Sequence, residues 1–122
     1  MTSQVKKSMQ NVDEQIRTLK IFFAEKIPKK MAEIEAYIQQ SELEPLNLVH
    51  WDRLLLAMHT LAGSSGSFGF EEMGTRARSI EKKIHSLIDT GIVNQGQECS
   101  LLQTEVRQFV QWGRAHGNQF AD

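Results

Sequence analysis

Hydrophobic residues recur along this chain at intervals of three and four positions, which is the spacing of one face of an α-helix. No run of four or more residues between turn signals alternates between apolar and polar side chains, so the pattern gives no sign of a half-buried strand. The pattern therefore predicts an all-α fold. Several amphipathic helices joined by short connections pack most simply as an antiparallel four-helix bundle, here with an additional or extended N-terminal helix.

The N-terminal third of the chain contains two consecutive stretches with this spacing. The first stretch is marked by Met9, Val12, Ile16, Leu19 and Phe23, and the second by Ile27, Met31, Ile34 and Ile38. Pro28 lies where the two meet, and a proline bends or ends a helix because it lacks a backbone donor and restricts the residue before it. The sequence leaves open whether residues 8–39 form one kinked helix or two.

Three further helices are expected in the rest of the chain. The segment 41–47 breaks the spacing and contains Pro45, so it is predicted to be a connection. One helix follows over about 49–67, and Gly69 then allows a tight turn because glycine readily adopts the left-handed conformation. The next helix runs from Glu71 to about residue 90. A loop over 91–96 leads to the last helix, about 97–112, which is expected to fray through Gly113 and Gly117 into a tail over 113–122.

Composition and charge exclude several classes of function. A chain of 122 residues fits one domain, residues 1–122, and a net charge of −1 argues against a nucleic-acid partner. No apolar run approaches the roughly 18–20 residues of a membrane span, and no signal-peptide pattern follows the N-terminus. We therefore expect a cytoplasmic protein with no membrane partner.

No metal site or cofactor is expected. Cys99 is the single cysteine, and His50, His85 and His116 lack metal-ligand spacing with it or with each other. A haem-binding or metal-binding helical bundle is the alternative that an absorbance spectrum and a metal assay would test. Against it, the sequence has no Cys-x-x-Cys-His site for haem attachment, and the methionines of the central helices fall on apolar stripes.

Four of the eight glycines fall within twelve consecutive residues, and two of them interrupt a predicted helix. Gly63 and Gly66 each cost about 1 kcal/mol relative to alanine inside a helix, so another effect must offset them. Both lie near His59, on the flank of the apolar stripe. Either these glycines permit close helix packing beside an ordinary surface histidine, or they keep the imidazole open to a reactive group on a second protein.

The run from His59 to Gly69, His-Thr-Leu-Ala-Gly-Ser-Ser-Gly-Ser-Phe-Gly, followed by Ile80-Glu81, resembles the signature of histidine-containing phosphotransfer (HPt) domains. The family pattern is His-x-Leu-Lys-Gly-Ser-Ser/Ala, two variable residues, an apolar residue and Gly, with an apolar residue and Glu or Gln one helix later. The resemblance is specific over about residues 49–90. It implies a four-helix bundle that passes a phosphoryl group between aspartates and is not itself an enzyme.

The resemblance implies a role for each matching position. His59 would be the phosphoacceptor, and Glu81 would orient its imidazole through a hydrogen bond. Gly63 would be the small residue that opens the site. Apart from the resemblance, the helix angles place Gly66 on the same flank, which its missing side chain would clear, and Gly69 is expected to form the turn that folds the next helix back.

One position departs from the family pattern and affects what can be expected of the site. Ala62 stands where family members commonly have a lysine whose charge can meet the phosphate, which puts the stability and rate of the phosphohistidine in question. Arg78 and His85 on the following helix are the nearby cations that could substitute. Together with Leu56, an apolar residue on the outer side of the His59 flank, they are the candidate contacts for partner docking.

The partners implied are response-regulator receiver domains and an upstream sensor or hybrid histidine kinase, with Mg²⁺ held by the receiver domain rather than by this chain. We expect the protein to act as a monomer. The alternative is an HPt-like docking module that binds a receiver or another partner without carrying phosphate, and Ala62 favours it. Residues 1–15 form an N-terminal extension that could lengthen the bundle, cover an edge or pair with another chain.

Overall fold

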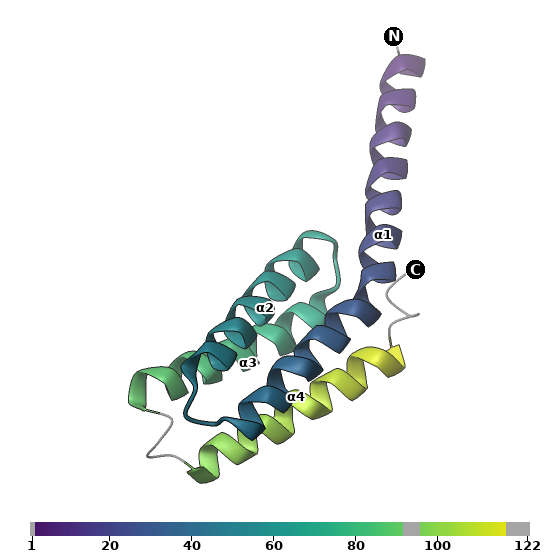
Figure 1. Cartoon of the computed structure of the whole chain (residues 1–122). Helices are drawn as coiled ribbons and strands as arrows, with labels where there is room; N and C mark the ends of the chain where they lie inside the picture. Colours follow the sequence, from purple (N-terminus) through teal and green to yellow (C-terminus); the bar gives the residue numbers. More distant parts are fainter. Residues whose placement is uncertain (1, 92–95, 117–122) are drawn as a thin grey trace.

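The computed structural model describes residues 2–91 and 96–116, with side chains from residue 11 onward. It contains the helices α1 (Thr2–Leu43), α2 (Leu48–Ser67), α3 (Glu71–Thr90) and α4 (Gly96–His116), which pack side by side as a bundle (Figure 1). No strand is found within those two ranges. The predicted all-α, four-helix bundle with an extended N-terminal helix is therefore confirmed.

α1 is one continuous helix of 42 residues that includes Pro28. Proline has no N–H to donate, and its ring crowds the carbonyl four residues earlier, here that of Ala24. In Figure 1 the upper and lower turns of α1 run along different lines, so the helix bends along its length. The open question of one kinked helix or two is answered in favour of one.

The connection after α1 is shorter than the sequence suggests, because the helix continues to Leu43. The side chain of Asn47 accepts a hydrogen bond of 3.1 Å from the Val49 N–H and so caps α2.

Apolar side chains from all four helices meet in one core. It buries the apolar faces of α2, α3 and α4 and the predicted stripe of the C-terminal half of α1. Its members include Phe23, Ile27, Met31, Ile34, Ile38, Trp51, Leu54, Met58, Leu61, Met73, Ala77, Ile80, Ile84, Leu102, Val106, Phe109 and Val110.

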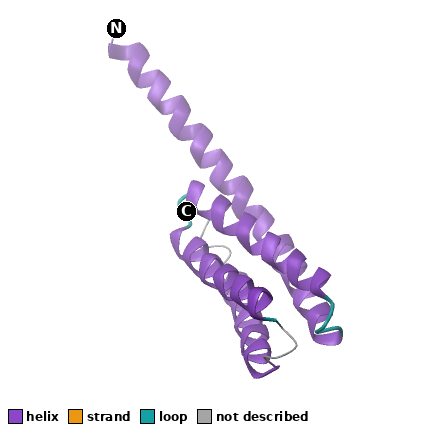
Figure 2. Cartoon of the chain, turned by 90° about the vertical axis from the view of Figure 1, so that its left-hand side faces the viewer, coloured by secondary structure: helices purple, strands orange, loops and turns teal. Residues whose placement is uncertain are grey.

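The first stretch of the N-terminal stripe does not join this core. Val12, Ile16 and Leu19 are 51%, 46% and 48% exposed, and every residue from 11 to 19 is exposed. Figures 1 and 2 show the first turns of α1 projecting beyond the other helices. We call residues 2–22 the N-terminal arm. Residues 11–19 extend past the bundle rather than cover one of its edges.

The C-terminal helix is longer than predicted, and the expected fraying from Gly113 is wrong. α4 continues to His116, and Gly113 is buried against α1. A Cβ atom at Gly113 would lie 2.5 Å from the sulfur of Met31, so any larger residue here would force the Met31 side chain to shift. Residues 113–116 are therefore part of the bundle, and the rest of the predicted tail, 117–122, lies outside the described residues.

The turn between α2 and α3 makes these two helices antiparallel neighbours. Gly69 adopts a φ of +80°, as its sequence position predicts. The Phe70 N–H donates to the Ser65 carbonyl at 2.8 Å and the Gly69 N–H to the Gly66 carbonyl at 3.3 Å, the bonds of a Schellman motif. Phe70 also stacks on Phe23 with ring centroids 5.1 Å apart, which fastens the turn to α1.

Candidate functional site

The side chains of His59 and Glu81 meet between the middle of α2 and the middle of α3. His59 Nδ1 lies 2.7 Å from Glu81 Oε1, although the two residues are 22 positions apart in the chain. The histidine side chain is 71% exposed, whereas that of Glu81 is only 24% exposed. The carboxylate therefore acts as a partly buried anchor that holds an imidazole ring standing in solvent.

This hydrogen bond determines which nitrogen of His59 is available for chemistry. A carboxylate only accepts hydrogen bonds, so the proton of the neutral ring lies on Nδ1 and the lone pair on Nε2. No side chain or backbone group in the described part of the protein hydrogen-bonds to Nε2. An exposed imidazole nitrogen of this kind can attack an electrophilic phosphorus atom.

Gly74 on α3 allows the two helices to come close enough for this pairing. A Cβ atom at Gly74 would lie 3.4 Å from both the Ala62 carbonyl oxygen and the Ser65 Cβ, so the α3 backbone lies directly against α2. Sequence reasoning did not assign this role to Gly74. The available signal was a third glycine inside a predicted helix, where it is unfavourable unless a close approach requires it.

Gly63 and Gly66 have a different environment from Gly74. A Cβ atom at either position would meet nothing within 4 Å, so neither glycine is needed for contact between helices. Gly63 lies one turn after His59 on α2, and helical side chains lean toward the N-terminus of their helix. The absence of a side chain there leaves open space next to the imidazole.

The cations near the site differ in how they are engaged. Ala62 is buried, with 2% exposure, so a side chain at this position points into the core. Arg78 and His85 lie one turn before and one turn after Glu81 and are both exposed. His85 Nδ1 lies 3.1 Å from an Asp89 carboxylate oxygen, whereas Arg78 has no hydrogen bond or ion pair within the described ranges. Arg78 is thus the cation that is free to meet an anionic group.

A groove of about 230 Å³ opens between α1 and α2, and His59 is not among the residues that line it. Leu56, which is 66% exposed, and Thr60, the neighbour of His59, lie on its α2 side. Sequence reasoning identified Leu56 but missed the α1 wall, which includes Lys30, Glu33 and Tyr37. The only signal in the sequence was a tyrosine next to the apolar stripe of α1.

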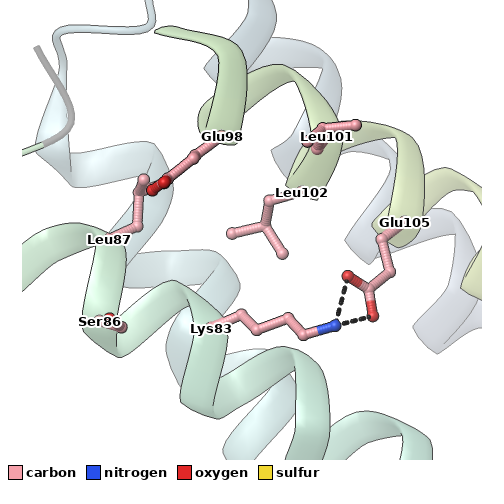
Figure 3. A pocket seen from close by; sticks show the side chains of 7 residues that line it. All are labelled: Lys83, Ser86, Leu87, Glu98, Leu101, Leu102 and Glu105. Atoms are coloured by element: carbon pink, nitrogen blue, oxygen red, sulfur yellow. Dashed lines mark hydrogen bonds and ion pairs between the residues drawn. The ribbon is translucent and has the colours of Figure 1, made fainter. Parts of the chain in front are cut away.

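Two larger cavities, of about 400 and 410 Å³, lie between α3 and α4. Figure 3 shows the first, where the Lys83 ammonium group donates hydrogen bonds of 2.8 and 2.9 Å to the two carboxylate oxygens of Glu105. Neither cavity is lined by His59 or Glu81. The size of a cavity therefore does not locate the nucleophile in this protein.

Neither Cys99 nor the potential metal ligands form a second reactive or metal-binding site among the described residues. Cys99 is buried, and burial raises the pKa of its thiol, which keeps it protonated near neutral pH. Across residues 2–91 and 96–116, no group of three or more His, Cys, Asp or Glu residues could hold a metal ion. The helices in the same ranges are too short or too polar to cross a membrane.

The family model of the Hpt domain matches residues 10–112 of the chain. The match includes His59, Glu81 and the whole of α2 and α3, and it begins within the N-terminal arm. No curated protein and no solved structure matches the chain.

Proposed function

Because the chain belongs to the Hpt domain family, we propose that it is a histidine phosphotransfer protein of a two-component phosphorelay, with His59 as its phosphoacceptor. Hpt domains are phosphocarriers rather than enzymes, and in general they interact with receiver domains and histidine kinases. His59 would accept the phosphoryl group from a receiver-domain aspartate or a kinase and pass it to a response-regulator aspartate.

The observation that supports this proposal most directly is the hydrogen bond between His59 and Glu81. It holds the ring in one orientation, it fixes the tautomer, and it leaves Nε2 on the solvent side of a ring that is 71% exposed. An ordinary surface histidine needs none of these features. A phosphocarrier needs all of them, because its nucleophile must enter the active site of another protein.

The transfer step is a displacement at phosphorus. The Nε2 lone pair attacks the phosphorus of an aspartyl phosphate, an N–P bond forms, and the P–O bond breaks to release the aspartate carboxylate. The ring then carries a proton on Nδ1 and a positive charge, which the Glu81 carboxylate stabilises. Most of the stabilisation of the transferred group comes from the partner, whose receiver domain holds the Mg²⁺ ion.

Arg78 is our candidate for the cationic role that Ala62 leaves empty. It is exposed, it lies on the same face of α3 as Glu81, and no carboxylate among the described residues pairs with it. A guanidinium group suits phosphate oxygens because it offers several donors in one plane.

The groove between α1 and α2 is our candidate docking surface for the receiver domain. Leu56 gives it an exposed apolar contact next to His59, and Lys30 and Glu33 give it charged edges. His85, one turn after Glu81 on α3, would contact the same partner from the other side of the imidazole.

A phosphotransfer assay tests the proposal. The parent chain is incubated with a receiver domain that carries ³²P on its aspartate, and we expect label on the chain that is labile to acid and stable to alkali, as phosphohistidine is. His59→Gln should abolish the label. His116→Gln is the matched control, since it removes another partly exposed histidine that lies at the end of α4, outside the site, and it should keep the label. Equal labelling of His59→Gln, or no labelling of the parent by any receiver tried, would contradict the proposal.

The docking module without phosphate is the second candidate, and Ala62 is the feature that favours it. Binding and labelling separate the two functions. If the chain binds a receiver, acquires no label, and His59→Gln binds and signals as well as the parent, then the docking function holds and phosphotransfer does not.

A further inference from the structure

The N-terminal arm is a feature that phosphotransfer at His59 does not use. α1 has 42 residues, whereas α2, α3 and α4 have 20, 20 and 21, so about half of α1 has no counterpart in the bundle. Residues 11–19 are exposed on every side of the helix. Figures 1 and 2 show this part of α1 standing alone, away from the other helices.

The arm nevertheless has an apolar face. Val12, Ile16 and Leu19, which we call the arm stripe, follow each other at intervals of four and three positions and are each about half exposed. In the sequence the same intervals lead back to Met9 and Val5. An alternation of three and four is the repeat of helices that pair as coiled coils.

A solitary helix of this length is marginal in water, because most helices in proteins gain their stability by packing an apolar face against a partner. No element within the described ranges packs against residues 11–19. The arm stripe therefore has no partner among the described residues.

The order of charges along the arm favours a second copy of the chain as that partner. The sequence is basic at Lys6-Lys7, acidic at Asp13-Glu14, and basic again at Arg17 and Lys20. When two such helices align antiparallel about residue 10, the acidic pair of each copy stands level with the basic pair Lys6-Lys7 of the other. A parallel alignment in register instead brings residues of like charge to the same level, which is unfavourable.

The antiparallel alignment also fits the shape of the protein. Centred on residue 10, it overlaps residues 2–18 of the two copies, which lie within the N-terminal arm, and it leaves the two bundles at opposite ends. We propose that two copies of this chain pair antiparallel through the arm stripe. The resulting dimer replaces the monomer expected from the sequence, and each His59 stays open to its own receiver domain.

Measuring the molar mass of the full chain against concentration, by sedimentation or light scattering, tests this proposal. We expect a dimer at micromolar to tens of micromolar concentrations, and Ile16→Lys should weaken association at least tenfold. Ile21→Lys is the matched control: Ile21 is 41% exposed, lies on the opposite side of the arm and should leave association unchanged. Near-ultraviolet circular dichroism of the buried Trp51 checks that the bundle stays folded in each variant.

Three results would overturn the proposal. The first is a parent chain that remains a monomer at 100 μM or above, and the second is equal weakening by Ile16→Lys and Ile21→Lys. The third is a monomeric chain whose arm binds vesicles of anionic phospholipid, since a basic amphipathic helix can also lie on a membrane surface.

A cross-linking experiment tests the orientation of the pair separately. In a Cys99→Ala background, Leu19→Cys should form little disulfide between copies under mild oxidation, because antiparallel pairing about residue 10 keeps the two Leu19 positions about 27 Å apart at 1.5 Å per residue. Efficient formation of that disulfide would show a parallel pair and overturn the antiparallel arrangement.

Discussion

In the C-terminal half of α1, Ile27 and Ile34 are buried almost completely, whereas in the arm Ile16 and Leu19 keep nearly half of their surface exposed. Both halves have the same three-and-four spacing of apolar residues and belong to one continuous helix. The difference comes from their neighbours, because α2 and α4 pack against the C-terminal half of α1 and end before the arm. The spacing of apolar residues thus reports that a helix has a face to bury, and it does not report which molecule covers that face.

The boundary between the exposed arm and the buried half of α1 falls between Phe22 and Phe23. Substituting each of these two residues gives the largest expected difference in stability between the halves. Phe23→Ala should destabilise the protein by about 3–5 kcal/mol, since its ring is buried and stacks on Phe70. Phe22→Ala should cost less than about 1 kcal/mol, because Phe22 is 55% exposed and the Lys26 ammonium lies over its ring, 4.1 Å from the centroid. Urea unfolding of both variants measures the difference, and similar losses would mean that the boundary lies elsewhere.

The close approach of α1 and α4 provides the next test of the buried half. Gly113→Ala should destabilise the bundle by about 1–2 kcal/mol net, because the new methyl group meets the sulfur of the fully buried Met31. Gly63→Ala, where a Cβ meets nothing, should stabilise it by up to about 1 kcal/mol. Thermal unfolding measures whether each variant loses or gains stability. A gain in both variants would show that the Met31 side chain moves aside without strain.

A larger side chain at Gly63 should separate the stability of the bundle from the function of its site. Gly63→Leu should keep the fold and improve helix stability by up to about 1 kcal/mol. Transfer to His59 should slow by roughly 10²-fold, because the new side chain stands in the space next to the imidazole and displaces the incoming phosphoryl group. Circular dichroism and the phosphotransfer assay measure the two effects, and unchanged transfer would mean that the glycine serves another purpose.

Removal of the arm should have the smallest effect on the bundle. In dilute solution, where chains are monomeric, deletion of residues 2–18 should change the free energy of unfolding by less than about 0.5 kcal/mol, because residues 11–18 are exposed and touch no other helix. Phosphotransfer to His59 should also be unchanged. A substantial loss of stability at low protein concentration would show that the arm contacts the bundle after all.

The residues that could be found from sequence are those whose roles depend on local chain geometry. The left-handed turn at Gly69 and the burial of Ala62 follow from helix periodicity and backbone preference alone. Gly74 and Gly113 could not be assigned in this way, because each serves a contact with a residue on another helix, Ser65 in one case and Met31 in the other. Sequence reasoning treated Gly113 as a place where a helix ends, since a glycine that weakens a helix and one that permits close packing look the same in one dimension.

By itself, the sequence determined that this protein is a bundle of amphipathic helices with a histidine, His59, close to two glycines inside the same helix. Both features can be recognised from one helix alone, because the spacing of apolar residues and the unfavourable effect of glycine on a helix do not depend on neighbouring elements. Only the tertiary structure decided the 2.7 Å contact between His59 and Glu81, since two side chains 22 residues apart meet according to how α2 and α3 are rotated and aligned. The tertiary structure also decided that the apolar stripe of α1 is buried in the core at its C-terminal end and exposed to solvent in the arm. Burial depends on what lies opposite a residue, and the identity of that neighbour is a fact of three dimensions.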